Sequence, residues 1–199
     1  MGLTTTGRGR PRNAGRLPGV EGIWVFLGAD LVIFCVLFVS FMKDRTAQPA
    51  LFERSRLTLS HTLGGADTLI LLTSSWLVAL AVEAARGDEP KRSRICLAGG
   101  SLAGAVFVLS KSVEYGEKFA AGVTPATDSF FMWYFTLTGM HLAHVVVGSC
   151  LLAALWARSR KSAHGDGEHV LLLLESVASF WHLVDLLWII MFPLLYLTR

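Results

Sequence analysis

Residues 171–197 read LLLLESVASFWHLVDLLWIIMFPLLYL. A helix of this length rises about 1.5 Å per residue and therefore exceeds the roughly 30 Å hydrocarbon core of a bilayer. The stretch nevertheless contains Glu175, His182 and Asp185. A charge near the middle of a membrane helix costs at least about 2.5 kcal/mol, so such side chains usually face the interior of a bundle. Spacings of seven and three residues place these three on one helical face. The stretch predicts a membrane helix with one polar, inward face.

The composition of the whole chain also indicates a membrane protein. Of its 199 residues, 53% are hydrophobic and 17% are charged, and the mean hydropathy is +0.52. Five stretches are long and apolar enough to span a bilayer, at residues 23–42, 66–85, 95–113, 130–156 and 171–197. Unbroken apolar runs such as residues 69–72 argue against the alternating pattern of a membrane β-barrel. The chain is therefore predicted to be an all-α bundle of five transmembrane helices.

The polar segments predict the ends and the orientation of the bundle. Residues 1–16 are rich in Thr, Gly and Arg, so we expect a disordered tail before one membrane domain at 17–199. The first helix continues to Met42 without a small-residue cleavage site, so no cleaved signal peptide is expected. A cytoplasmic N-terminus and an outside C-terminus put eleven Lys and Arg residues inside and seven outside. The modest net charge of +3 fits attraction to anionic lipid, and no nucleic acid is expected as a partner.

The three cysteines lie in three different predicted helices, as Cys35, Cys96 and Cys150. None has the close partner that a disulfide, a zinc site or a thiolate copper site would use. We interpret all three as small buried apolar residues.

Three histidines, His141, His144 and His182, fall inside predicted helices. Two b-type haems would need four axial ligands on facing helices, which this set does not supply. His141 and His144 are neighbours at i, i+3, and Thr138 lies on the same side. A metal site there would need a further ligand such as His182 or Glu114. We favour hydrogen-bonded packing between helices over that metal site.

The end of the third predicted helix carries charges near the membrane surface. Lys111 is spaced to pair with Glu114, and Glu114 with Lys118. A second interpretation is that Lys111 and Tyr115 contact lipid headgroups, because both residue types reach that depth. Earlier in the same helix, the Gly-x-x-x-Gly pattern at 100–104 permits a close approach of another helix.

Asp30 lies inside the first predicted helix with no basic residue within a helical turn. Its carboxyl group is therefore either protonated or paired with another helix. A neutral acid that bonds to another helix and a proton-carrying site both remain open.

Several segments together resemble subunit III of the haem-copper oxidases, the cytochrome c oxidase family. The resemblance is to its short five-helix branch, which includes proteins associated with nitric oxide reductase. The matching segments are GIWVFLGAD (22–30), DTLILLTSSW (67–76), KSVEY (111–115), TGMHLAHV (138–145) and WHLVDLLW (181–188). They occur in the family's order and cover about residues 20 to 197.

The resemblance implies a non-catalytic subunit in a bacterial plasma membrane. Such a subunit supports the stability and proton uptake of a catalytic subunit in aerobic electron transport. It implies no catalytic residue, metal or cofactor in this chain, with haem and copper held by a partner subunit. The implied partners are oxidase subunits I and II, and phospholipid. The first two helices of longer members are missing, so lipid-binding residues are not carried over. Asp30 stands where the family has a buried Glu or Asp.

The sequence therefore predicts one interhelical polar network or subunit interface. Its expected members are Asp30, Glu114, His141, His144, Glu175, His182 and Asp185. One alternative is an accessory subunit of a nitric oxide reductase system. A more distant one is a small proton-coupled transporter that uses Asp30 and Asp185.

Overall fold

The computed structural model describes residues 21–161 and 167–197, and every long element in them is helical. In chain order these are α1 (Glu21–Ala47), α2 (Pro49–Arg56), α3 (His61–Arg86), α4 (Pro90–Ala120), α5 (Ser129–Lys161), α6 (Gly167–Phe192) and the π-helical turn η1 (Pro193–Leu197). Five of the helices are long and apolar enough to cross a membrane, with α6 continuing into η1. The prediction of an all-α bundle with five membrane-spanning helices is confirmed. The tail expected at 1–16 lies outside the described residues.

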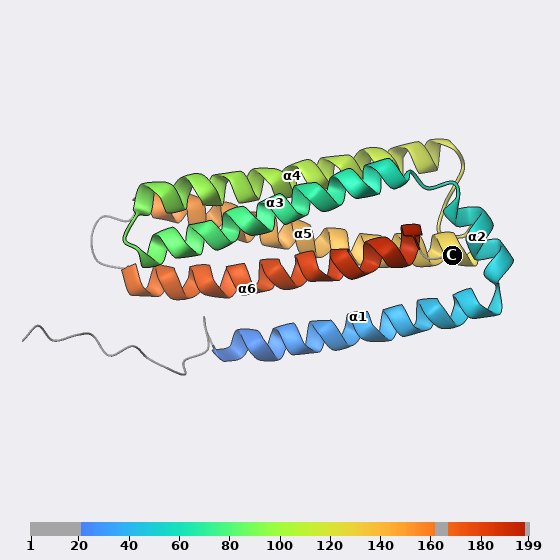
Figure 1. The fold of residues 1–199 in the computed structure, drawn as a ribbon, viewed down its shortest axis with the longest axis horizontal. Coiled ribbons are helices and arrows are strands. Elements are labelled where there is room, and N and C mark those ends of the chain that lie inside the picture. The colour runs from blue at the N-terminus through green and yellow to red at the C-terminus, as the bar shows by residue number, and fades with distance from the viewer. Residues whose placement is uncertain (1–20, 162–166, 198–199) are drawn as a thin grey trace, which may run out of the picture.

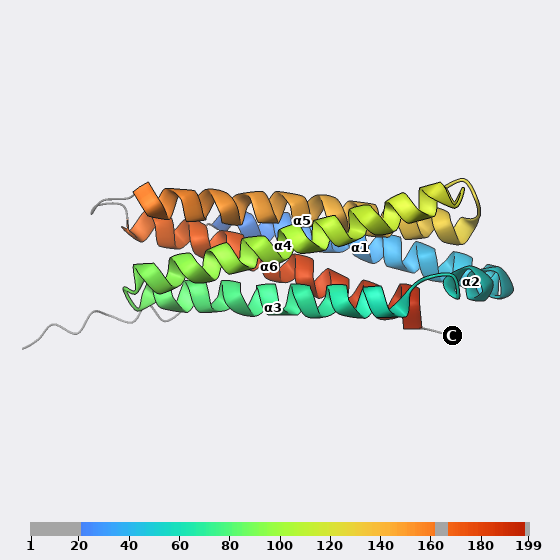
Figure 2. The same ribbon diagram turned by 90° about the horizontal axis from the view of Figure 1, so that it is seen from above.

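Four helices, α3 to α6, form the central bundle, and α1 lies along α5 and α6 at its side (Figure 1). Seen from above, the five long helices run along one common axis (Figure 2). The short helix α2 and the turn η1 lie together at one end of the molecule, which we call the α2 end. The connection from α3 to α4 lies at the opposite end. Helix α2 was not predicted, because eight residues of mixed polarity are too few to show a helical periodicity.

Local signals explain where the helices begin and end. Ser60 caps α3, since its hydroxyl accepts a hydrogen bond from the Leu63 amide at 3.4 Å. Asp128 caps α5 in the same way, accepting from the Phe131 amide at 2.8 Å. Pro193 has no amide proton, and the regular α-helical bonding of α6 changes there to the wider turn of η1. This change of winding places Tyr196 in the bundle interior.

The core is built around aromatic side chains of α6. Trp181 is fully buried because Gly104 of α4 and Gly148 of α5 leave room for its ring. A Cβ atom at Gly148 would lie 2.6 Å from Trp181 Cε3, and one at Gly100 would lie 2.9 Å from Val78 Cγ2. The close helix packing predicted from the pattern at 100–104 is therefore confirmed.

Much of the outer surface is apolar, as expected for a protein that faces lipid tails. Helix α1 exposes most of its large side chains, including Trp24, Val25, Phe26, Leu31, Val32, Ile33, Val36, Val39 and Met42. Cys96 is buried, but Cys35 and Cys150 face outward. The expectation that all three cysteines are buried is wrong for these two. They lie on lipid-facing helix surfaces, where lipid tails surround a small apolar side chain as favourably as the protein core does.

Candidate functional site

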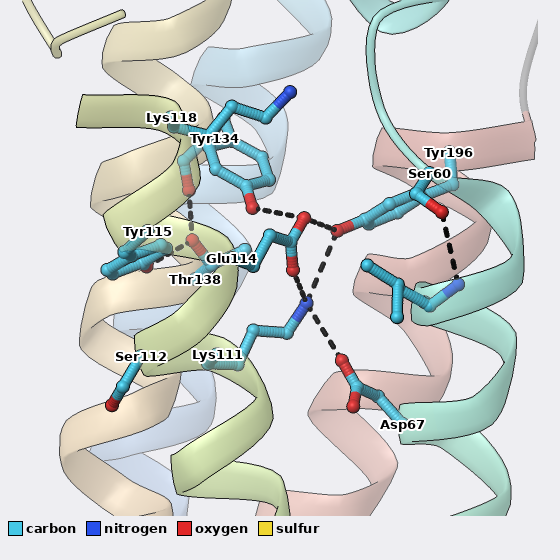
Figure 3. Close-up of polar contacts among 12 residues, drawn as sticks. Ser60, Asp67, Lys111, Ser112, Glu114, Tyr115, Lys118, Tyr134, Thr138 and Tyr196 are labelled. Carbon is cyan, nitrogen blue, oxygen red and sulfur yellow. Dashed lines mark hydrogen bonds and ion pairs between the residues drawn. The ribbon is translucent and has the colours of Figure 1, made fainter. Parts of the chain in front are cut away.

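The largest group of buried polar side chains surrounds Lys111 (Figure 3). Lys111 Nζ lies 2.6 Å from Glu114 Oε2 and 3.0 Å from Asp67 Oδ2, and it is 1% exposed. It also donates to the hydroxyl of Tyr196 at 3.3 Å. Tyr134 completes the set, which we call the Lys111 cluster: Asp67 of α3, Lys111 and Glu114 of α4, Tyr134 of α5 and Tyr196 of η1. The cluster therefore joins four elements through side chains alone.

Glu114 is the common acceptor of the Lys111 cluster. The hydroxyls of Tyr134 and Tyr196 donate to its Oε1 at 2.7 and 3.2 Å, while Lys111 donates to Oε2. A buried carboxylate needs such donors, because no solvent is available to replace them. Asp67 has fewer partners, since its Oδ1 has none among the described residues. Glu114 is thus the well-satisfied acid of the cluster and Asp67 the less satisfied one.

Aromatic rings enclose the lysine. Its Nζ lies 4.8 Å from the ring centroid of Trp188, 5.7 Å from that of Tyr196 and 5.9 Å from that of Phe107. Ring faces attract a cation, and more strongly where water is excluded. The lipid-headgroup contact expected for Lys111 is wrong, because two carboxylates inside the bundle hold its ammonium group.

Two neighbouring expectations also change. Tyr115 was expected to contact lipid headgroups, but its hydroxyl lies 2.6 Å from Thr138 Oγ1 and forms a hydrogen bond within the bundle. Lys118 donates to the backbone carbonyl of Thr58 at 2.9 Å. The predicted pairing of Lys118 with Glu114 does not form, because Glu114 turns inward to Lys111.

Helix α2 holds the Lys111 cluster from outside. Its Arg56 is buried and donates to the backbone carbonyl of Tyr196 at 2.9 Å. The same guanidinium pairs with Glu53 at 2.6 Å. Directly before it in the chain, Ser55 donates to Asp128 at 2.8 Å, which ties α2 to the start of α5. These contacts fix η1, and with it the position of the Tyr196 hydroxyl.

A second polar contact attaches α1 to α5. His144 Nε2 lies 3.0 Å from Asp30 Oδ1, and His144 Nδ1 lies 2.7 Å from the Met140 carbonyl. A carbonyl only accepts, so Nδ1 carries a proton. The bond between Nε2 and Asp30 then needs one more proton, on either the imidazole or the carboxyl group. Asp30 thus has a partner on another helix, and the two residues share one proton.

The polar stripe of α6 divides among different surroundings. Glu175 lies at the end opposite α2 and pairs with Arg86 of α3, with Nη2 2.9 Å from Oε1. His182 Nδ1 lies 2.6 Å from Ser75 Oγ, and its side chain is exposed. Asp185 is buried, and its carboxyl group interacts with the Ser75 hydroxyl, although neither oxygen forms a hydrogen bond of 3.5 Å or less among the described residues. The expectation of one inward face holds for Asp185 and is wrong for His182.

His141 is fully buried and has no polar partner for either ring nitrogen within the described part of the chain. Its ring stacks on Trp188 at a centroid distance of 5.1 Å and meets the edge of Phe107 at 5.6 Å. His144, three residues later, points instead toward α1. Residues at i and i+3 are about 60° apart around a helix. Here that angle is enough for His141 to face α6 while His144 faces α1.

The single network expected from the sequence is therefore wrong as one connected unit. Four separate polar contacts take its place: the Lys111 cluster, Asp30 with His144, Arg86 with Glu175, and Ser75 with His182. Sequence reasoning missed Asp67, Tyr134, Tyr196 and Arg86 as members of these contacts, and it missed Arg56 beside the Lys111 cluster. One usable signal was the lysine itself, because a lysine in a membrane helix needs an acid from a neighbouring helix.

The donor groups of the described helices do not fit a metal ion. Among the described residues, no group of three or more His, Cys, Asp and Glu side chains is arranged to hold one. The two further ligands considered for the histidine pair are engaged elsewhere, Glu114 by Lys111 and His182 by Ser75. The arrangement instead connects membrane helices to one another.

Comparisons with known proteins agree with this architecture. The profile of the family described as cytochrome c oxidase subunit III matches residues 19–198. Quinol oxidase subunit 3 of Bacillus subtilis is 30% identical over 189 residues, which cover 92% of this chain and 88% of that protein. Cytochrome c oxidase subunit 3 of Synechocystis sp. is 29% identical over 177 residues, covering 88% of this chain and 74% of that protein. Cytochrome bo(3) ubiquinol oxidase subunit 3 of Pseudomonas aeruginosa is 28% identical over 195 residues, with coverages of 89% and 84%.

Proposed function

Given that the chain belongs to the cytochrome c oxidase subunit III family, and is a subunit III of a haem-copper oxidase, we propose that its role in the complex is structural. It supports the stability and the proton uptake of a catalytic subunit and carries out no chemistry of its own. The protein is a multi-pass membrane protein and part of an oxidoreductase complex. The relatives described above are named as oxidase subunits, and no observation favours a nitric oxide reductase system or a transporter.

The observation that supports a structural role is the direction of the polar side chains. In the Lys111 cluster, each polar group of α3, α4, α5 and η1 is directed at another helix of the same chain. Asp30 and His144 likewise join α1 to α5. Because lipid cannot satisfy such groups, they hold the helices at fixed positions relative to one another. A bundle fixed in this way suits a subunit that supports a neighbour.

The proposal extends to cofactors, partners and location. Haem and copper belong to a partner subunit, because the donor groups of the described residues suit interhelical bonds better than metal ligation. The partners are oxidase subunits I and II, with phospholipid against the exposed apolar side chains of helices such as α1. The membrane is a bacterial plasma membrane. The distribution of Lys and Arg supports a cytoplasmic N-terminus and a C-terminus outside.

The test is purification of the tagged chain from native membranes at a low detergent concentration. We expect haem-bearing subunits to co-purify and a reduced-minus-oxidised spectrum typical of a terminal oxidase. The same complex prepared without this chain should keep its haem spectrum and lose oxygen-reducing activity faster during turnover. Purification of the chain alone, or with the spectrum of a nitric oxide reductase, would overturn the proposal.

A further inference from the structure

His182 lies near the middle of its membrane span and points out of the bundle. The span runs from His169 to Leu197, so the histidine is about 20 Å from either end at the rise of an α-helix. Its side chain is exposed, and its Nδ1 is engaged by Ser75 Oγ at 2.6 Å. Its Nε2 has no partner among residues 21–161 and 167–197. A polar atom therefore faces outward at the depth of the lipid tails.

Other exposed polar groups of the spanning helices are satisfied in a different way. Thr73, Ser112 and Thr136 each donate to the carbonyl four residues earlier in their own helix, at 2.7 to 2.8 Å. These hydroxyls can face lipid at little cost. An imidazole has two polar nitrogens and cannot satisfy both in this way. His182 needs a second polar partner from outside the described bundle, whichever tautomer it adopts.

A large aromatic side chain lies beside it. Trp76 of α3 follows Ser75 directly, is 63% exposed, and is about 15 Å from the end of the helix at Arg86. Membrane tryptophans usually gather at headgroup depth, whereas exposed tryptophans are common anchors of protein interfaces. The depth of Trp76 therefore favours a protein neighbour over lipid.

These side chains form one outward surface, which we call the α3–α6 face. It consists of Leu72, Ser75 and Trp76 of α3 with His182 and Leu186 of α6. Leu72 and Trp76 are one helical turn apart, as are His182 and Leu186, so each pair lies on one side of its helix. Apart from Ser75, all of these side chains are exposed. The face combines apolar area with one unpaired hydrogen-bonding atom at its centre.

We propose that the α3–α6 face docks a membrane-spanning helix of another subunit of the oxidase. That helix carries a hydrogen-bonding group at mid-depth, which meets His182 Nε2, and its apolar side chains pack on Trp76. Lipid tails supply no such group, and headgroups lie too far along the helix to reach it. The inference rests on the proposed function, because it takes the partner from the same complex.

Three variants separate a contact with the partner from a contact inside the chain. His182→Leu removes both, Ser75→Ala removes only the internal bond, and His182→Gln keeps a polar group near the place of Nε2. We expect His182→Leu to lower retention of the chain in the purified oxidase by roughly fivefold, the effect of one interhelical hydrogen bond. Ser75→Ala and His182→Gln should be retained like the natural protein. Equal loss in His182→Leu and Ser75→Ala, or no loss in His182→Leu, would overturn the proposal.

Photo-crosslinking identifies what covers the face. A benzophenone amino acid at Trp76 is compared with one at Leu102, which is 66% exposed on α4. We expect the Trp76 position to crosslink to another oxidase subunit and the Leu102 position to lipid. A crosslink from Trp76 only to lipid or to a second copy of this chain would overturn the inference while leaving the proposed function intact. Failure of the natural chain to co-purify with haem-bearing subunits would instead overturn the proposed function.

Discussion

Lys111 of α4 and Asp67 of α3 form an ion pair of 3.0 Å in which each side chain is only 1% exposed. Burying two charges costs several kcal/mol, and their attraction recovers that cost only while both partners are present. Glu114 adds a second carboxylate at 2.6 Å from the same ammonium group. The three residues therefore depend on one another, and the lysine is the member whose loss leaves the most charge unpaired.

Replacement of Lys111 by Met should destabilise the bundle by about 3 to 5 kcal/mol, because two buried acids lose their cation. The measurement is the midpoint of thermal unfolding of the purified complex. The matched control is Arg86→Ala, since Arg86 is 56% exposed in its pair with Glu175 and such surface pairs contribute about 0 to 1 kcal/mol. Adding Asp67→Asn and Glu114→Gln to Lys111→Met should recover part of the loss. Equal effects of Lys111→Met and Arg86→Ala would contradict this prediction.

The three tyrosines of the chain should respond differently to loss of their hydroxyls. Tyr134→Phe and Tyr196→Phe each remove a donor to the buried Glu114, with an expected cost of about 1 to 3 kcal/mol. Tyr115→Phe should cost less, because Thr138 also bonds the Tyr134 carbonyl at 2.5 Å and keeps a partner. The thermal unfolding midpoints of the three variants, measured under the same conditions, rank the three losses of stability. A larger loss in Tyr115→Phe than in the other two would be inconsistent with Glu114 as the common acceptor.

The long helices could be predicted because the length of an apolar run is a local property of the chain. The observed helices extend beyond the predicted spans, since a helix continues through polar residues once it has left the hydrocarbon. Helix α4 begins at Pro90 rather than 95 and ends at Ala120 rather than 113. Such ends are stabilised by caps and loops, which an analysis of hydropathy does not include.

The partners of the polar side chains were harder to predict. The predicted pairing of Lys111 with Glu114 is confirmed, whereas the second interpretation, which placed Lys111 at the headgroups because it lies near the end of an apolar run, is wrong. Its actual direction depends on the rotation of α4 toward α3 and on Tyr196, which the turn after Pro193 brings inward. His141 and His144 were expected to act together, but their small angular separation directs them to different helices. The spacing of residues within one helix predicts which side chains share a face of that helix. Which other helix packs against that face depends on the tertiary structure.

Glycine substitutions should show where the helices need close approach. A Cβ atom at Gly104 would collide with Ser149 Oγ and lie 2.8 Å from Trp181. Gly104→Ala should therefore cost about 1 to 3 kcal/mol through forced movement of a closely packed core. Gly116→Ala is the control in the same helix, since nothing lies within 4 Å of its Cβ position, and it should be neutral or slightly stabilising. Similar losses from the two substitutions would indicate a helix-wide effect rather than contact with Trp181.

Helix α1 is attached to α5 by the Asp30–His144 contact and by a bond from Trp133 Nε1 to Asp44 Oδ2 at 2.8 Å. The contribution of the Asp30–His144 contact should depend on a hydrogen bond rather than on a fixed charge pair. Asp30→Asn places an amide donor opposite His144 Nε2 and needs no extra proton, so it should keep most of the stability. Asp30→Leu leaves that nitrogen without its partner and should cost about 1 to 3 kcal/mol. His144→Leu should cost a similar amount, because it leaves Asp30 Oδ1 unpaired beside Oδ2, which already has no partner among the described residues.

The double variant Asp30→Leu with His144→Leu tests this account of α1 most directly. Replacing both partners by apolar groups leaves no buried polar atom unpaired, so its loss should be smaller than the sum of the two single losses. Thermal unfolding gives the energies, and limited trypsin cleavage after Lys43 or Arg45, at the end of α1, reports detachment of the helix itself. Cleavage should be fastest in the single leucine variants and slow in Asp30→Asn. Additive losses, with Asp30→Asn as labile as Asp30→Leu, would mean that the carboxylate charge, and not the hydrogen bond, holds α1 in place.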